Sequence, residues 1–186
     1  MSASEPDLPP QPIVWEALAS HEATREWPRL NDWVEDLRHI HLIEANTIPP
    51  CWHRHPILVE HLVALRSHWL TSHIGDHASA PFVWLSDLAG WEPRIRQIVA
   101  RLGCKPGTCR TPQLALWPGE TEPDPAEAPP QFNPTDRDKD FDTYTAWDIQ
   151  RRQIIEDTYR AMILATLDTD DQGSGQDPED DQDATG

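Results

Sequence analysis

Three cysteines and two histidines have types and spacings suited to binding a metal ion. Cys104 and Cys109 are separated by four residues that include Pro-Gly, which is a spacing that structural zinc sites use. Cys51, His53 and His55 lie together in a second short segment. Thiolates and imidazoles are the ligands that zinc prefers in structural sites. The two segments therefore predict a structural zinc site, provided that the fold brings them together.

The expected backbone conformation decides which residues of the second segment could be ligands. His55 precedes Pro56, and a residue before proline is biased toward extended geometry. In an extended chain Cys51 and His55 would lie roughly 13 Å apart, whereas residues two apart would be separated by about 6.6 Å on one face. The longer distance is too great for one tetrahedral ion. We therefore predict that the ligands are Cys51, His53, Cys104 and Cys109.

Two other interpretations of these residues need no metal. In the simpler one, His55 caps a helix, Trp52 anchors the core and Cys51 is an ordinary buried thiol, as protein interiors favour. In the other, Cys104 and Cys109 form a regulatory thiol pair. The sequence is thus compatible either with no cofactor or with one structural zinc ion.

A run of basic residues forms a second candidate site. It contains no acidic residue, and such a run could contact the phosphates of a nucleic acid. Otherwise it is a solvated helix face or a docking site for the acidic C-terminus. The basic residues are Arg94, Arg96, Arg101, Lys105 and Arg110.

The nine histidines raise the question of acid–base catalysis, because histidine titrates near neutral pH. The sequence has no nucleophile elbow, no glycine-rich phosphate loop and no His-Glu-x-x-His motif. We therefore expect that the chain is not an enzyme. A His-based metalloenzyme is the catalytic alternative.

The elements that must position these residues are predicted to be helices. Apolar residues recur at three- and four-residue intervals, and no alternating strand pattern is present. Prolines and glycines mark the expected boundaries of a small core of three to four helices. The predicted helices cover residues 28–46, 56–73, 81–89 and 93–102, with Gly90 as the break between the last two.

Composition predicts how the rest of the chain is organised. The formal net charge is −17, but residues 25–111 hold 10 basic and 9 acidic residues, so the acidity belongs to the flanks. Proline-rich and acidic flanks cannot bury enough apolar surface to fold alone. We predict a mostly disordered tail over 1–24, a helical core domain over 25–110, a Pro-rich acidic linker over 111–139, a C-terminal helix over 140–167 and a disordered acidic tail over 168–186.

A tryptophan-rich pattern runs through this core. It comprises a Trp-x-x-Leu-x-x-Trp-Val helix, a Cys-Trp-x-x-His-Pro motif and an apolar second helix, and its residues are Trp27, Leu30, Trp33, Val34, Cys51, Trp52, His55, Pro56, Leu62, Leu65, Trp69 and Trp84. Over about residues 25–110 the chain resembles an uncharacterised family of helical actinobacterial proteins, often carried on plasmids, phages and integrated elements. The resemblance implies a mobile-element setting and marks no catalytic residue.

The chain is expected to be soluble and cytoplasmic. Residues 1–12 have no basic segment followed by an apolar run, and no stretch approaches the ~20 apolar residues that span a bilayer. Three cysteines cannot all pair within one chain, which suits a reducing compartment.

The function that fits these observations is that of a non-enzymatic adaptor or accessory protein of a bacterial mobile element. We expect the C-terminal helix and the acidic tail to contact a protein partner. The apolar stripe of that helix must be buried on the core, on a second copy or on a partner. The alternatives are a zinc-stapled nucleic-acid-binding module and the His-based metalloenzyme.

Overall fold

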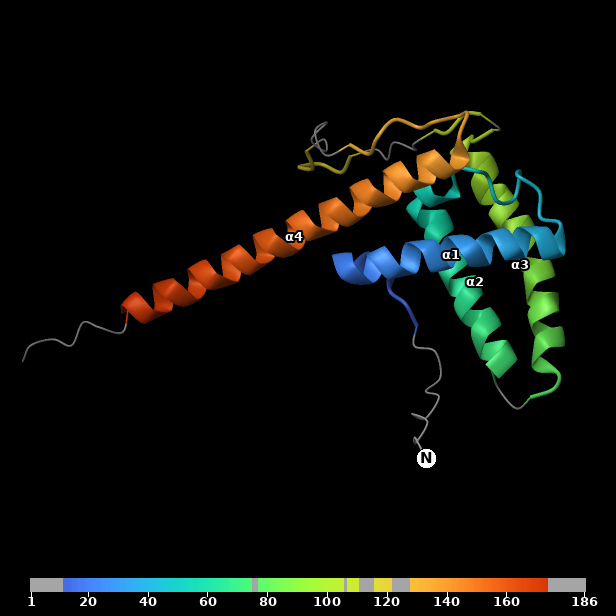
Figure 1. The fold of residues 1–186 in the computed structure, drawn as a ribbon, viewed down its shortest axis with the longest axis horizontal. Helices are drawn as coiled ribbons and strands as arrows, with labels where there is room; N and C mark the ends of the chain where they lie inside the picture. Colours follow the sequence, from blue (N-terminus) through green and yellow to red (C-terminus); the bar gives the residue numbers. More distant parts are fainter. Residues whose placement is uncertain (1–11, 75–76, 106, 111–115, 122–127, 174–186) are drawn as a thin grey trace, which may run out of the picture.

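The computed structural model describes residues 12–74, 77–105, 107–110, 116–121 and 128–173. Within these residues the chain is all-α, as predicted, with four α-helices and two short 3₁₀ turns (Figure 1). The remaining parts of the expected tails and linker lie outside the described residues.

Helix α1 spans Ser20–His41 and begins eight residues before the predicted start. The Glu22 side chain accepts a hydrogen bond from the Ala19 backbone N–H at 2.9 Å, and this satisfies one of the donors at the helix start. Pro28 therefore lies inside the helix, on its exposed side, and not at the first position.

The segment before α1 is also part of the fold. The 3₁₀ turn η1 spans Trp15–Ala17, and Trp15 is buried edge-to-face against Trp27, with ring centroids 4.7 Å apart. The described residues 12–24, which were expected within a mostly disordered tail, thus supply core contacts.

Helices α2, Pro56–Ile74, and α3, Ala80–Leu102, pack side by side. The two helices predicted on either side of Gly90 are one continuous α3, so that prediction was wrong. Gly90 is exposed, and the helical spacing of buried residues continues on both sides of it. The buried residues of α3 are Trp84, Leu88, Ile95, Ile98 and Val99.

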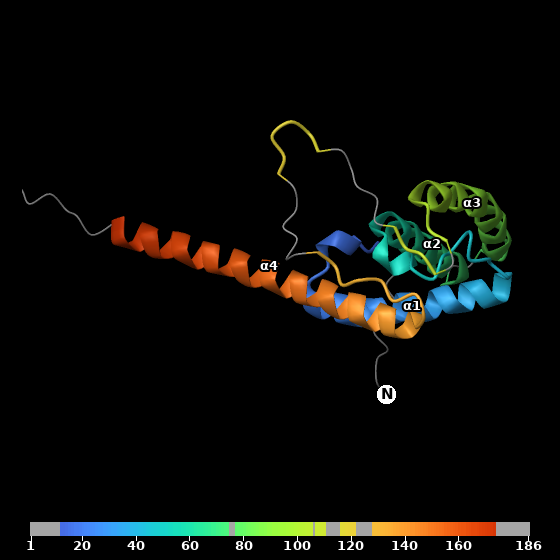
Figure 2. The same cartoon turned by 90° about the horizontal axis from the view of Figure 1, so that it is seen from above.

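Helix α4 spans Arg137–Gly173 and is about 55 Å long at 1.5 Å per residue. It extends beyond both ends of the predicted helix, into the expected linker and tail. Its first half packs against α1, and its second half projects away from the other helices (Figures 1 and 2). None of the described helices is both long and apolar enough to cross a bilayer.

An aromatic cluster joins these elements. Trp27 of α1 is 2% exposed and contacts rings from η1, from the turn before α2 and from α4. Burial of such large side chains stabilises a small domain strongly. The rings around Trp27 belong to Trp15, Trp52, Phe141 and Tyr144.

Candidate metal centre

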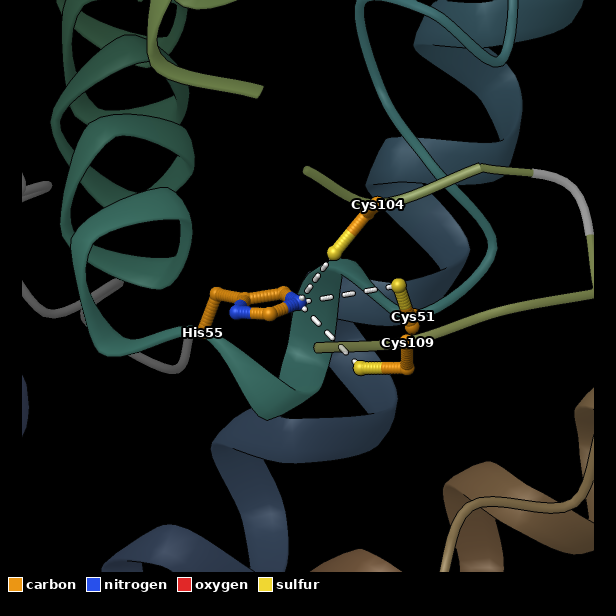
Figure 3. A group of neighbouring side chains, drawn as sticks. All are labelled: Cys51, His55, Cys104 and Cys109. Atoms are coloured by element: carbon orange, nitrogen blue, oxygen red, sulfur yellow. Dashed lines mark hydrogen bonds between the residues drawn. The ribbon is translucent and has the colours of Figure 1, made fainter. Parts of the chain in front are cut away.

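Four potential metal ligands converge where α2 begins and α3 ends (Figure 3). They are Cys51, His55, Cys104 and Cys109, and their ligand atoms all lie within 4.8 Å of one another. Cys51 and His55 are buried, and the other two cysteines are half-buried. All three cysteines are free of disulfides.

The distances around His55 match a tetrahedral ion. Its Nε2 atom lies 3.6 Å from Cys51 Sγ, 3.1 Å from Cys104 Sγ and 3.3 Å from Cys109 Sγ. Around zinc, an ideal tetrahedron separates a ligand sulfur from a ligand nitrogen by about 3.5 Å. One ring nitrogen carries a single hydrogen or a single lone pair and cannot bond to three sulfurs at once. An ion at the centre would satisfy all four atoms.

The structure corrects the predicted ligand set at one position, because His55 and not His53 faces the thiols. Residues Trp52–Arg54 form the 3₁₀ turn η2, not an extended strand. A 3₁₀ helix rises about 2 Å per residue, so Cys51 and His55 come much closer together than an extended chain would allow. His55 itself keeps the extended backbone that Pro56 favours, with φ −119° and ψ 100°.

His55 also begins helix α2. Its carbonyl oxygen accepts hydrogen bonds from the backbone N–H groups of Leu58 at 2.8 Å and Val59 at 3.1 Å. Pro56 follows at the first helical position, where its missing N–H costs nothing. The capping role that the sequence suggested for His55 and a role as ligand are therefore compatible, because the first uses its backbone and the second its ring.

His53 is turned to the opposite side and binds Asp140 of α4. Its Nε2 lies 3.0 Å from Asp140 Oδ2, and both side chains are at most 1% exposed. Burial lowers the pKa of His53 to about 3, although the Asp140 carboxylate favours protonation. The ring is thus neutral near pH 7 and donates its Nε2–H to the carboxylate. It takes no part in the cluster formed by Cys51, His55, Cys104 and Cys109, which we call the thiol cluster.

The two remaining cysteines are held by a short hairpin. Helix α3 ends at Gly103, which has the left-handed φ of 71° that glycine adopts without strain. Lys105 and Thr108 then exchange backbone hydrogen bonds of 3.0 and 2.9 Å. The hairpin places Cys104 and Cys109 on either side of this bridge, both facing His55 (Figure 3).

The three thiols differ in pKa. The hydrogen bond between Cys51 and Cys109 is the largest influence on both, raising the pKa of Cys51 and lowering the pKa of Cys109 to about 5. Burial raises the pKa of Cys104. Metal ligands must be deprotonated, so Cys109 is the thiol best prepared for an incoming cation.

Arg54 connects the metal centre to the start of α4. Its guanidinium binds both carboxylate oxygens of Asp140, at 2.8 and 2.6 Å, and donates to the carbonyl of Pro130 at 2.7 Å. Burial raises the pKa of Asp140, but the Arg54 guanidinium outweighs it and holds that pKa below its ordinary value. Because Arg54 lies between Cys51 and His55 in the chain, the turn that places these two side chains also carries the residue that holds α4.

The predicted basic residues are all exposed, and they do not form one surface. Arg94 and Arg101 are seven residues apart on α3 and share a face, whereas Arg96 points elsewhere and lies 3.7 Å from Glu92. Lys105 and Arg110 lie on the cysteine hairpin. Among the described residues, only Arg96 of this set forms an ion pair.

Comparisons with known proteins give no further guide, because no family model, curated protein or solved structure matches this chain.

Proposed function

We propose that this chain is a non-enzymatic helical adaptor in which a structural zinc ion holds the domain together and α4 is the arm that contacts other proteins. The observation that carries the proposal is the set of four donors formed by Cys51, His55, Cys104 and Cys109. Three sulfurs and one nitrogen complete the tetrahedral shell of a structural zinc site. A catalytic zinc site keeps one position open for water, and this set of ligands leaves none.

The zinc ion would act as a staple between distant parts of the chain. It would join the turn before α2 to the hairpin after α3, and these segments are 49 residues apart in the case of His55 and Cys104. The same turn supplies His53 and Arg54, which hold Asp140. In this way the metal would set the direction in which α4 leaves the domain.

The biological setting that we propose is the reducing cytoplasm of a bacterium, where the thiols stay available for zinc. An accessory role in a mobile element follows from the resemblance of the tryptophan-rich core described above. The exposed apolar side chains in the second half of α4 support the adaptor role, because no described residue covers them.

Metal analysis of untagged, full-length protein tests this proposal. We expect about one zinc ion per chain, as four ligands imply. The double variant Cys104→Ser, Cys109→Ser should lose the metal and melt at a lower temperature, because structural zinc contributes directly to folding. Thr108→Ser changes the same hairpin without removing a ligand and should keep the metal. A folded native chain without metal, with a double variant of equal stability, would overturn the zinc centre.

A second candidate function is nucleic-acid binding, and four exposed cations that form no ion pair with the described residues favour it, two of them on the cysteine hairpin. Lys105 and Arg110 are exposed on the cysteine hairpin, and Arg94 and Arg101 lie on the adjoining helix. Binding of duplex DNA should weaken steeply as salt rises, and the Lys105→Ala variant should reduce the slope by about one charge. Full-length protein that ignores DNA at low salt would exclude this function.

A further inference from the structure

Two members of the thiol cluster are paired by the cysteine hairpin itself, residues 104–110. Lys105 and Thr108 exchange both backbone hydrogen bonds, so they form a hydrogen-bonded pair of an antiparallel bridge. Cys104 and Cys109 are the next residues outward on the two arms and therefore lie opposite each other. Residues in such a position have Cα atoms about 4.5 Å apart and side chains on the same side of the hairpin.

This placement suits a disulfide bond between Cys104 and Cys109. A disulfide requires Cα atoms roughly 4.4–6.8 Å apart. The two sulfur atoms already lie within 4.8 Å of each other, and both cysteines are free thiols. Rotations about the Cα–Cβ bonds can therefore bring the sulfurs to the ~2.05 Å of a disulfide, and the backbone of the hairpin need not open.

Access from solvent separates this pair from the third thiol. Cys104 and Cys109 are half-buried, whereas Cys51 is 2% exposed and packs within the turn before α2. Oxidation of a cysteine depends on exposure, so a small oxidant reaches the hairpin sulfurs first. The hairpin pair is thus the part of the thiol cluster that is open to chemical modification.

The hydrogen bonds that tie the cysteine hairpin to the turn before α2 belong to the thiol cluster. Among the described residues, all of them join cluster members to each other. The turn has separate anchors in the core. Trp52 packs against Trp27 with ring centroids 6.2 Å apart, and His53 binds Asp140 at 3.0 Å. Loss of the cluster therefore loosens the hairpin and leaves the turn anchored.

We propose that Cys104 and Cys109 are a site of reversible oxidative modification, in which a peroxide converts the two zinc-bound thiolates into a disulfide and the zinc ion leaves. The inference rests on the proposed function, because it names how the zinc centre is regulated.

The step consumes one molecule of hydrogen peroxide and proceeds by two displacements. The thiolate of one hairpin cysteine attacks a peroxide oxygen, the O–O bond breaks, and a sulfenic acid and a hydroxide ion form. The second thiolate attacks the sulfenic sulfur, forms the S–S bond and expels another hydroxide ion. The two sulfurs lose two electrons in total and the peroxide gains them. Protons from the solvent convert both hydroxide ions to water.

The disulfide leaves too few ligands to hold the metal. A sulfur in a disulfide no longer carries the negative charge of the thiolate that binds zinc. Only Cys51 and His55 remain, which is half of a tetrahedral shell. A dithiol reductant reverses the step by thiol–disulfide exchange: it becomes oxidised itself and returns both hairpin thiols for a new zinc ion.

Titration of the full-length zinc protein with hydrogen peroxide tests the proposal. Released zinc is measured with a chelating dye, and the remaining thiols are counted. We expect each chain to lose its zinc ion and two of its three thiols, and to regain both on treatment with a dithiol reductant and zinc. Protein that keeps its zinc while thiols are oxidised, or that loses zinc without forming a disulfide, would refute the proposal.

Tryptic digestion without reduction identifies the bond. Cys104 and Cys109 share the peptide of residues 102–110, because trypsin does not cleave after Lys105, which precedes proline. The expected bond therefore makes this single peptide lighter by two hydrogen atoms. A bond to Cys51 would instead join it to the peptide of residues 39–54, and that result would reject the pairing.

Two matched variants separate the pair from the third thiol. Cys51→Ser keeps both hairpin thiols and should form the same disulfide within peptide 102–110, whatever its affinity for zinc. Cys109→Ser leaves Cys104 without the thiol opposite it and should form less disulfide at the same dose of peroxide. An equal yield in the two variants would show that the opposed position in the hairpin gives no advantage.

The same samples distinguish this inference from the proposed function. Native protein that holds no zinc would overturn the proposed function, and its peptide map would still decide the disulfide. Zinc-bound protein whose map shows no bond between Cys104 and Cys109 after peroxide treatment would overturn this inference alone.

Discussion

Trp27 Nε1 donates a 3.0 Å hydrogen bond to Asp148 Oδ2, across 121 residues of sequence. The same carboxylate oxygen accepts from Arg152 Nε at 2.8 Å, and Arg152 in turn donates to the carbonyls of Trp15 at 3.1 Å and Leu18 at 2.9 Å. One buried acidic group therefore ties α1, α4 and the segment before α1 into a single unit.

Replacing Asp148 by alanine should destabilise the protein by about 3 kcal/mol or more, because it leaves the buried Arg152 charge without its partner. The free energy of unfolding, measured in urea, checks this. The control Arg160→Ala breaks the exposed pair with Asp157 and should cost under ~0.5 kcal/mol. An equal decrease in the free energy of unfolding in the two variants would show that the buried ion pair stabilises the protein no more than a surface pair does.

Substitution of His55 should remove zinc binding, whereas substitution of His53 should not. His55→Ala should abolish zinc binding, since it removes the one nitrogen that faces three thiols. His53→Gln should keep one zinc ion per chain and lower the free energy of unfolding by about 1 kcal/mol through a weakened bond to Asp140. Metal analysis and urea unfolding of both variants decide the matter. Loss of zinc in His53→Gln alone would identify His53 as the ligand.

The Glu26 carboxylate should stabilise the protein at pH 7, relative to Glu26→Gln, by under about 1 kcal/mol, as partly exposed ion pairs do, and this stabilisation should depend on pH. Burial raises the pKa of Glu26, but the guanidiniums of Arg66, at 3.0 Å, and Arg29, at 2.9 Å, outweigh it and hold the pKa below 4.5. A depressed folded pKa means that the contribution is present above the unfolded value and is lost as pH falls through the folded value.

Urea unfolding of both proteins as a function of pH measures this difference. The gap between native protein and Glu26→Gln should therefore close as pH falls below about 4.5. Acid effects elsewhere, including proton competition at the thiols, cancel in the comparison. A gap that stays constant from neutral to acid pH would contradict the role of the carboxylate charge.

Leu42→Gly should stabilise the protein by about 0.5 kcal/mol. Leu42 ends α1 with a left-handed φ of 55° and ψ of 38°, and its side chain is 84% exposed. A non-glycine residue there costs roughly 1–2 kcal/mol, and glycine gives back about 0.5–1 kcal/mol in unfolded-state entropy. Leu42→Ala keeps the strain and serves as the control. Thermal unfolding that ranks alanine above glycine would contradict this account.

The helical class was predictable because apolar intervals along α1, α2 and α4 set which faces are buried. The helix boundaries were less predictable than the helical class. Gly90 and Pro93 are residues that commonly end a helix. Here α3 continues through them, because Trp84 and Leu88 before them and Ile95 after them all pack onto the rest of the core. Tertiary contacts overrode local preference there, as they commonly do.

Most of the candidate metal centre could be predicted from the sequence. The thiols of Cys51, Cys104 and Cys109 come together as expected, because their types and spacing carry the signal. The choice between His53 and His55 depended on the conformation of Trp52–Arg54, for which the sequence has no marker other than the four-residue interval from Cys51 to His55. The three-and-four spacing of Ile155, Tyr159 and Met162 was visible in the sequence, but the exposure of these residues follows from where α1 starts.

The contact between the first and last helices is expected to form late in folding. Ser20 and Gln153 meet across 133 residues, and contacts of such separation form late because a long loop must close first. During synthesis, α1, α2, α3 and all four thiol and imidazole ligands leave the ribosome before α4 does. The domain around the ligands can therefore close while the face around Trp27 is still open to water. Until its own α4 arrives, that face can accept the α4 of a neighbouring chain, and we therefore expect misassembly of this protein to proceed by exchange of this helix between copies.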